Sequence, residues 1–353
     1  MLDINRFLSL DSYLDILKST DEPIFIYGMG DGCLKLLRIF DKYGIPCAGI
    51  FASDEFVRDK TFEGHKIRKL SEIESQVEKF TVVLAFGAGY QELRDKIDGI
   101  EKRHRLFVPD MPVIGEGLFT KEYLSENFDK IVEVYDLLGD EQSKYCFEKL
   151  IEYKITGLLE PLRACESLPD ENPLVLRSDE IYLDLGAYTG DTVADFLRAT
   201  GGKYRKIYAV EPNGRNFRKL SENTASLPDI SLINAAIGSE DGVTRVLKGG
   251  GRMIRKSDSG VEIQVRSVDS ILDNSDCTYI KMDIEGEEQA ALSGARSTIE
   301  KCSPKLNIAI YHRVGDLFEL PLMVHEMNPG YKLFIRHYPY YPAWDTNLYA
   351  MRK

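Results

Sequence analysis

The sequence predicts an α/β fold made of two doubly wound, mainly parallel sheets joined by a helical segment. Short apolar strands alternate with amphipathic helices over residues 23–112, and the same alternation returns after residue 180. Between these stretches, from about 116 to 176, apolar residues recur at three- and four-residue steps, which is typical of helices. We therefore expect an α/β domain over residues 1–115, a helical linker over 116–176 and a second α/β domain over 177–353.

The composition is that of a soluble globular protein, with 43% hydrophobic and 29% charged residues over 353 positions. A net charge of −12 argues against a nucleic-acid partner. The chain has no apolar run near the roughly 18 residues that span a bilayer, so no membrane association is expected. Its 6 cysteines form no C-x-x-C pair, which favours reduced thiols in a cytoplasmic protein.

The first α/β stretch carries two glycine-rich turns. One turn, G-x-G-x-G, follows the first strand, but the third glycine of a dinucleotide fingerprint is replaced by Cys33. The second turn is a G-x-G after the fourth strand, which we expect to neighbour the first. Together with an acid after the second strand, these turns predict a possible second ligand site at Gly28, Gly30, Gly32, Asp54, Gly87 and Gly89. Ligand binding and a structural or oligomerising role, for example in a homodimer, remain equal alternatives for this domain.

In the second α/β stretch, strands are expected at 181–186, 206–211, 231–237, 278–284 and 306–311, and a terminal antiparallel hairpin at 331–337 and 345–351. Helices are expected at 191–199, 214–225, 287–300 and 316–327. A β-rich insertion lies between residues 238 and 277, and its G-G-G-R at 249–252 is read either as a lid or as a hairpin turn.

The most informative stretch is I-Y-L-D-L-G-A-Y-T-G-D-T at residues 181–192. Gly186 and Gly190 make a turn after a strand, and Asp191 and Thr192 are good N-cap types for the next helix. The following strand ends in Glu211, at the distance expected of an acid that grips a ribose. An acid before the first glycine suits a ligand with an ammonium or sulfonium group, such as S-adenosylmethionine. The alternative is an ordinary strand–helix turn.

Further motifs carry a family resemblance. They are A-V-E-P-N (209–213), N-A-A-I-G (234–238), S-V-D-S-I-L (267–272), Y-I-K-M-D-I-E-G-E-E (279–288), A-L-S-G-A (291–295) and A-I-Y-H (309–312). Residues from about 180 to the C-terminus resemble the FkbM-type S-adenosylmethionine-dependent O-methyltransferases. The resemblance implies a seven-stranded class I methyltransferase sheet with an antiparallel terminal hairpin. The first half looks like the small Rossmann-like domains that precede the catalytic part of some sugar-modifying acyltransferases.

The resemblance also implies a cofactor site at the carboxyl ends of the strands. Its expected members are Asp184, Gly186, Tyr188, Gly190, Asp191, Thr192, Glu211, Asn213, Asn234, Ala235 and Asp283. His312, at the end of the fifth strand, is predicted to be the catalytic general base, next to Asp283 at the methyl-transfer centre. The main prediction assigns no metal, but Asp283, Glu285 and His312 could alternatively hold a divalent ion.

We therefore predict an S-adenosylmethionine-dependent O-methyltransferase acting on a sugar, a glycan or another small hydroxylated acceptor. One alternative is a nicotinamide-dependent oxidoreductase or epimerase, and another is a non-catalytic cofactor-binding scaffold. Aromatic residues crowd the loop of the terminal hairpin, at Tyr338, Tyr340, Tyr341 and Trp344. They are read either as a sugar-stacking surface or as loop packing.

Overall fold

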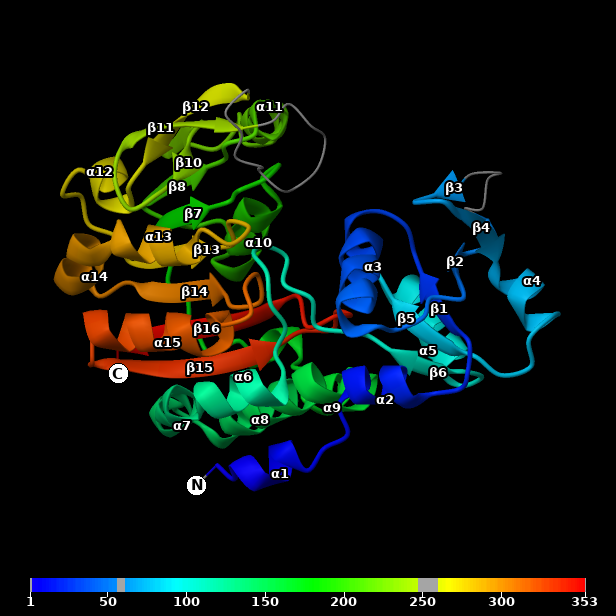
Figure 1. Ribbon diagram of the computed structural model, residues 1–353. Coiled ribbons are helices and arrows are strands. Elements are labelled where there is room, and N and C mark those ends of the chain that lie inside the picture. Colours follow the sequence, from blue (N-terminus) through cyan, green and yellow to red (C-terminus); the bar gives the residue numbers. More distant parts are fainter. Residues whose placement is uncertain (1, 56–60, 247–259, 353) are drawn as a thin grey trace.

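The computed structural model describes residues 2–55, 61–246 and 260–352 (Figure 1). The expected G-G-G-R turn at 249–252 lies outside the described residues. Two α/β bodies lie side by side, and helices run along the bottom of the view beneath both (Figure 1). Among the described residues, none of the helices combines the length and apolarity needed to cross a membrane.

The first sheet has six strands in the order β3-β4-β2-β1-β5-β6. Their bounds are β1 Ile24–Tyr27, β2 Gly49–Ala52, β3 Thr61–Phe62, β4 His65–Lys69, β5 Thr81–Leu84 and β6 Arg105–Phe107. All neighbours pair in parallel except β3 and β4, a short edge hairpin that the sequence analysis did not anticipate. Strand β1 pairs with β5, so the two glycine-rich turns are neighbours as expected.

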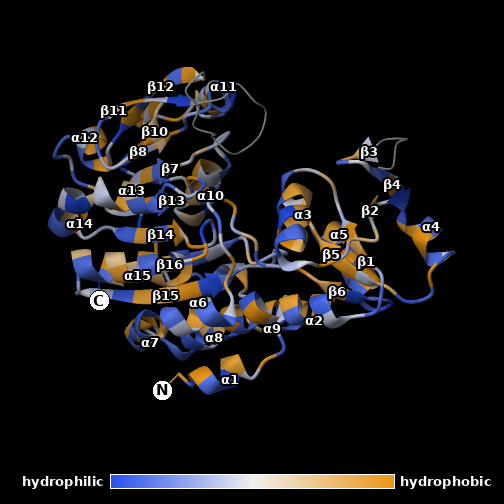
Figure 2. Ribbon diagram, viewed as in Figure 1, coloured by the Kyte–Doolittle hydropathy of each residue, from blue (hydrophilic) through white to orange (hydrophobic). Residues whose placement is uncertain are grey.

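Helices α3 Asp31–Tyr43, α4 Leu70–Glu74 and α5 Gln91–Glu101 connect these strands. The strands β1, β2 and β5 are buried throughout, and Figure 2 shows β1 and β5 coloured mainly as hydrophobic. Such continuous apolar runs are typical of parallel strands that are covered on both faces. Helix α3 ends at Gly44, whose φ of 67° provides a left-handed C-cap.

The linker is helical, as predicted. It contains α6 Lys121–Glu126, α7 Phe128–Leu137, α8 Glu141–Thr156, α9 Leu159–Ala164 and a 3-10 turn at Pro169–Glu171. The N-terminal helices α1 Ile4–Leu8 and α2 Tyr13–Ser19 precede the first strand. Arg6 of α1 forms ion pairs with Glu148 and Glu152 of α8, so the first residues of the chain lie against the linker.

The second sheet has seven strands in the order β15-β16-β14-β13-β7-β8-β9. Their bounds are β7 Ile181–Leu185, β8 Lys206–Val210, β9 Ile230–Ile233, β13 Tyr279–Met282, β14 Lys305–Ala309, β15 Tyr331–His337 and β16 Thr346–Arg352. Only the pairs that involve β16 are antiparallel, so the predicted terminal hairpin is confirmed. The insertion forms a small sheet of β10 Ala236–Ile237, β11 Gly242–Val246 and β12 Val261–Arg266. The two-sheet α/β fold class is confirmed.

The helices of this half are α10 Asp191–Ala199, α11 Gly214–Asn223, α12 Val268–Leu272, α13 Glu288–Ser293, α14 Arg296–Cys302 and α15 Asp316–Met327. The single helix predicted over 287–300 is wrong, because it is divided at Gly294. The carbonyl of Gly294 accepts a hydrogen bond from the backbone of Asp269 at 2.8 Å. A β-carbon at Gly294 would collide with the backbone of Gly238, so the break lets two segments approach closely.

Candidate functional site

A cavity of about 790 Å³ opens at the carboxyl edge of the seven-stranded sheet. Its walls come from the loops after β7, β8, β13 and β14 and from the insertion. Six of the predicted cofactor residues line it, namely Gly186, Tyr188, Asp191, Thr192, Glu211 and Asp283. Ligands of open α/β sheets bind outside the carboxyl ends of strands. The volume also lies within the roughly 300–1,000 Å³ of small-molecule sites.

The loop after β7 brings bare backbone to this cavity. Gly186 has a φ of 87°, and a β-carbon there would collide with the carbonyl of Asp283. The residue must therefore be glycine for β7 and β13 to meet at the cavity floor. Gly190, with a φ of 94°, is the N-cap of α10. The prediction that Asp191 or Thr192 caps this helix is wrong, because they are its first two residues and Gly190 precedes them.

Asp184 lies beneath the cavity rather than in its wall. Its side chain is fully buried, and the Thr192 hydroxyl donates to Oδ2 at 2.5 Å. Its Oδ1 has no hydrogen-bond partner among the described residues. Burial raises the pKa of this carboxyl group, although Lys281 and the Thr192 hydroxyl act in the opposite direction. Asp184 thus supports Thr192, which does line the cavity.

Glu211 is positioned as a rigid acceptor. Its carboxylate is 6% exposed and lines the cavity. The backbone N–H of Tyr188 donates to Oε2 at 3.0 Å, and that of Asn213 donates to Oε1 at 2.8 Å. The Asn216 side chain also donates from Nδ2 to Oε1 at 3.5 Å, so Oε1 has two protein donors, whereas Oε2 keeps a lone pair for a ligand hydroxyl. Burial raises the pKa of Glu211 and these hydrogen bonds lower it, with burial prevailing.

Three further predicted cofactor residues lie near Glu211 in the loops after β8 and β9. Asn213 caps α11 by accepting the backbone N–H of Arg215 at 3.0 Å. Asn234 donates from Nδ2 to the carbonyl of Glu211 at 2.8 Å, and Ala235 is 2% exposed. The cavity wall is instead formed by the residues that follow, Ala236 to Glu240.

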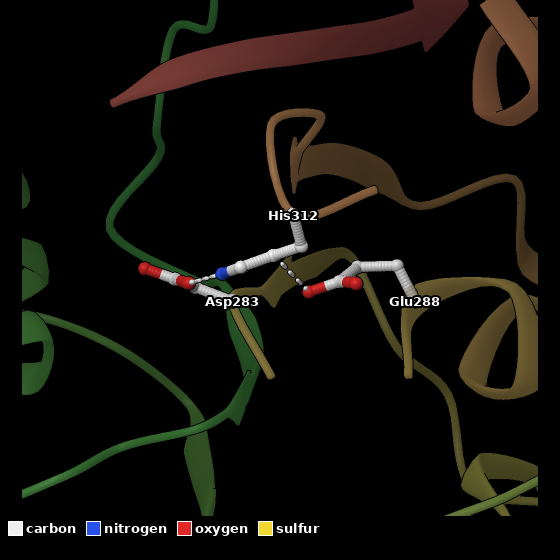
Figure 3. Close-up of side chains that lie close together, drawn as sticks. All are labelled: Asp283, Glu288 and His312. Atoms are coloured by element: carbon white, nitrogen blue, oxygen red, sulfur yellow. Dashed lines mark ion pairs between the residues drawn. The ribbon is translucent and has the colours of Figure 1, made fainter. Parts of the chain in front are cut away.

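His312 lies between two carboxylates, as Figure 3 shows. Its Nδ1 is 2.9 Å from Glu288 Oε1, and its Nε2 is 3.5 Å from Asp283 Oδ1 and 3.9 Å from Glu285 Oε2. Burial lowers the pKa of His312, but the neighbouring carboxylates, Glu288 above all, raise it to about 9. The imidazole is therefore protonated at neutral pH. It is also 1% exposed and is not part of the cavity wall. This geometry disfavours the general-base role predicted for His312.

The same cluster bears on the metal alternative. Among the described residues, Asp283, Glu288 and His312 have one ligand atom each within 4.8 Å of one another. The two carboxylates, however, approach different nitrogens of the ring (Figure 3). An ion can bind only one of these nitrogens, and it would have to displace the proton that the carboxylates hold there. The observed arrangement is that of a buried ion-pair cluster.

Lys281 and Tyr311 are among the polar residues of the cavity wall that the sequence analysis missed. The Tyr311 hydroxyl donates to Asp283 Oδ1 at 3.1 Å, and the Lys281 ammonium lies 3.9 Å from Asp283 Oδ2. Strand alternation could have found Lys281, because it is two residues before Asp283 and faces the same side of the sheet.

One wall of the cavity comes from outside the second sheet. Ile114, in the segment between β6 and α6, lines the cavity and donates its backbone N–H to the carbonyl of His312 at 3.0 Å. The Lys35 ammonium, on α3, holds the preceding residues by donating to the carbonyls of Pro112 at 3.0 Å and Val113 at 2.9 Å. The first domain thus fixes part of the cavity wall of the second.

The second predicted ligand site is divided in the structure. A β-carbon at Gly87 would lie 2.5 Å from the ring of Trp344, and one at Gly89 would lie 2.6 Å from the ring of Tyr340. This glycine turn therefore packs against the terminal hairpin loop, which favours the packing interpretation of the aromatic cluster.

Gly28 and Gly32, of the first glycine turn, lie against the residues that precede Gly87. Gly28 approaches the ring of Phe86, and Gly32 approaches the backbone of Ala85. Asp54 accepts the backbone N–H of Leu70 at 3.1 Å. It lines a separate cavity of about 350 Å³, whose described wall includes none of the five glycines predicted for this site. The six residues do not form one pocket.

Comparisons with known proteins agree with this description. Residues 184–328 match the family model described as the Methyltransferase FkbM domain. Among solved structures, methyltransferase FkbM from Methylobacillus flagellatus KT is similar, with a TM-score of 0.72, 20% identity, and coverage of 96% of this chain and 92% of that chain. Aeropyrum pernix fibrillarin with natively bound S-adenosyl-L-methionine gives a TM-score of 0.34, 13% identity, and coverage of 50% and 69%. A comparison with curated proteins found no match.

At 20% identity the first of these similarities establishes a shared fold, and it includes the N-terminal sheet and the linker because it covers 96% of the chain. The family match is independent of it and covers the loops after β7, β8, β13 and β14, which form the cavity. Residues 184–328, which include these loops, are thus similar to the methyltransferase FkbM domain.

Proposed function

We propose that the protein uses S-adenosylmethionine to methylate a hydroxyl oxygen of a sugar or another small polyhydroxylated acceptor. The observation that carries the proposal is the 790 Å³ cavity, in which the Gly186 backbone, Glu211 and Asp283 occupy the ends of three adjacent strands of a methyltransferase domain.

The residues present suit this cofactor. Glu211 presents a carboxylate in the cavity wall, and its Oε2 keeps a lone pair that suits a ribose hydroxyl. Gly186 lines the cavity with backbone alone, so the chain between ribose and sulfur can approach the main chain closely. When bound, S-adenosylmethionine supplies a methyl group on a positively charged sulfur.

Asp283 is the group best placed to orient an acceptor hydroxyl. Its side chain is 40% exposed in the cavity wall, whereas His312 is 1% exposed. Tyr311 and His312 hold its Oδ1 from two sides, which fixes the direction in which the carboxylate points. Methyl transfer depends mainly on such alignment, together with removal of the hydroxyl proton, for which Asp283 is the nearby acceptor.

Titration calorimetry with S-adenosylhomocysteine and with NAD tests the cofactor. We expect S-adenosylhomocysteine to bind and NAD not to bind. Glu211→Gln should weaken S-adenosylhomocysteine binding by about 100-fold, because the amide is uncharged and replaces one acceptor oxygen with a donor. Glu222→Gln, on the exposed face of α11, is the matched control and should bind normally. Binding of NAD alone would favour an oxidoreductase.

The oxygen specificity needs a separate test. The protein would be incubated with S-adenosylmethionine and a panel of sugars, polyols and amines, and the products would be analysed by mass spectrometry and NMR. We expect O-methyl ethers from hydroxylated acceptors. Methylation confined to nitrogen or carbon would contradict the proposed acceptor atom and leave the cofactor assignment intact.

A further inference from the structure

Lys281 is a cation at the centre of the second sheet. It lies on β13, where the register pairs it with Asp184 of β7. Residues two apart on a strand face the same side, so Lys281 and Asp283 project from the same face of the sheet. The Lys281 side chain is 16% exposed and reaches the cavity wall.

The surroundings keep Lys281 charged. Burial lowers the pKa of Lys281, but Asp283, Asp184 and Asp191 outweigh it and raise the pKa above its ordinary value. Among the described residues, the carboxylate oxygen nearest to the Lys281 ammonium is Asp283 Oδ2, and the distance of 3.9 Å is too long for a hydrogen bond. Lys281 lines the cavity, and no hydrogen bond from its ammonium to another described residue is observed, so an acceptor on a ligand in the cavity can bind it.

The other cation in the described part of the cavity wall is Arg313. Its Nε donates to the carbonyl of Gly286 at 2.8 Å, so its guanidinium is engaged in holding the loop after β13. Lys281 also lies nearer the Gly186 loop, since β13 and β7 are paired directly. Lys281 is therefore the cation of the cavity wall that lies on the strand next to β7 and its glycine loop.

The proposed cofactor ends in an amino-acid group with one ammonium and one carboxylate on the same carbon atom. A site for such a group needs opposite charges side by side. Asp191, which opens α10, and Lys281 line this part of the cavity and provide that pair.

We propose that the Lys281 ammonium binds the carboxylate of the methionine part of S-adenosylmethionine. This inference rests on the proposed function and assigns a binding role to a residue outside the predicted site. A ligand carboxylate completes the hydrogen bonding of Lys281, and the neighbouring aspartates accept the ligand ammonium.

Three ligands test the assignment on one variant, Lys281→Met. S-adenosylhomocysteine carries both charged groups, its decarboxylated analogue keeps only the ammonium, and 5′-methylthioadenosine has neither. Calorimetry should show the affinity for S-adenosylhomocysteine falling by roughly 10- to 100-fold, the loss expected for one charge-assisted hydrogen bond. The affinities for the other two ligands should stay within about 3-fold of wild type.

The comparison distinguishes a folding defect from a lost contact, because a damaged pocket would lower the affinity for all three ligands together. Lys281→Arg should restore much of the S-adenosylhomocysteine affinity, and Lys203→Met, in an exposed turn, is the control for losing a lysine elsewhere.

No loss for S-adenosylhomocysteine in Lys281→Met, or an equal loss for all three ligands that Lys281→Arg does not restore, would overturn the role of Lys281 while leaving the proposed function standing. A wild-type protein that binds none of the three would overturn the proposed function and this inference with it.

Discussion

At the scale of single residues, the sequence predicts where His312 lies but not which charged groups surround its ring and set its protonation state. The sequence predicts its position at the end of β14, beside Asp283. It does not show Glu288, which approaches the other ring nitrogen at 2.9 Å because the loop after β13 turns back. Two carboxylates around one buried imidazole make a cation of a side chain that was expected to accept a proton.

This charge state gives a pH dependence with a defined sign. The pKa of His312 is raised from 6.5 to about 9 in the folded protein. Its contribution to stability is therefore complete below pH ~6.5, and it is lost as the pH rises through about 9. The free energy of unfolding of wild type minus that of His312→Gln should shrink by up to about 3 kcal/mol between pH 6 and pH 9.5. Urea unfolding across this pH range measures it.

His325→Gln, on α15, is the control for losing a histidine elsewhere in the protein. A constant difference for His312→Gln would mean that the imidazole is neutral in the folded protein. The general-base role of His312 would then regain support.

At the scale of elements, periodicity and turn chemistry located most helices and strands of the second half, including α10 and α15 with their bounds. What the sequence could not show depends on contacts between distant segments. The break at Gly294 exists because another loop approaches its backbone, and the β3–β4 hairpin is two short, partly exposed strands without a clear alternation. Asp184 was placed beside the site, but its burial under Thr192 follows from packing alone, as does the hydrogen bond from Asn234 to the carbonyl of Glu211.

The segment that ends at Ile114 is the element with the most specific prediction. Lys35→Met removes two hydrogen bonds that hold Pro112 and Val113. Each is worth roughly 1 kcal/mol, so amide exchange over residues 112–117 should accelerate by about 10-fold or more. Hydrogen exchange with mass spectrometry measures this.

Lys42→Met, at the exposed end of the same helix, should leave the exchange of this segment unchanged. Exchange that stays slow in Lys35→Met would mean that the hydrogen bond from Ile114 to His312 is sufficient to hold the segment without the first domain.

At the scale of the whole molecule, the two sheets and the linker form one packed unit. Ala88 and Tyr341 exchange backbone hydrogen bonds of 2.6 and 3.1 Å across the two domains. The Tyr341 hydroxyl accepts from Arg163 of the linker at 2.9 Å. One hydrophobic cluster includes Phe25 of the first sheet, Phe147 of the linker and Leu306 of the second sheet. The predicted boundaries near 115 and 176 therefore separate segments of sequence whose packing is shared.

The chain contains 1 tryptophan, Trp344, and it reports on this interface. Gly87→Ala would place a methyl group 2.5 Å from the Trp344 ring. Because overpacking costs typically 1–3 kcal/mol, we expect a lower melting temperature and a red-shifted tryptophan emission. Gly99→Ala, in α5, has its nearest neighbour at 3.7 Å and should change neither. An unshifted emission spectrum in Gly87→Ala would show that the ring contact does not hold the domains together.

The cavity at the carboxyl edge of the second sheet is proposed to bind S-adenosylmethionine. A crystal structure of the protein with S-adenosylhomocysteine would show directly whether it does. We expect the ribose hydroxyls on the Glu211 carboxylate, the sulfur above the Gly186 loop, and the amino-acid group between Asp191 and Lys281. Ligand density in the 350 Å³ cavity beside Asp54, or an empty 790 Å³ cavity at saturating ligand, would contradict the account.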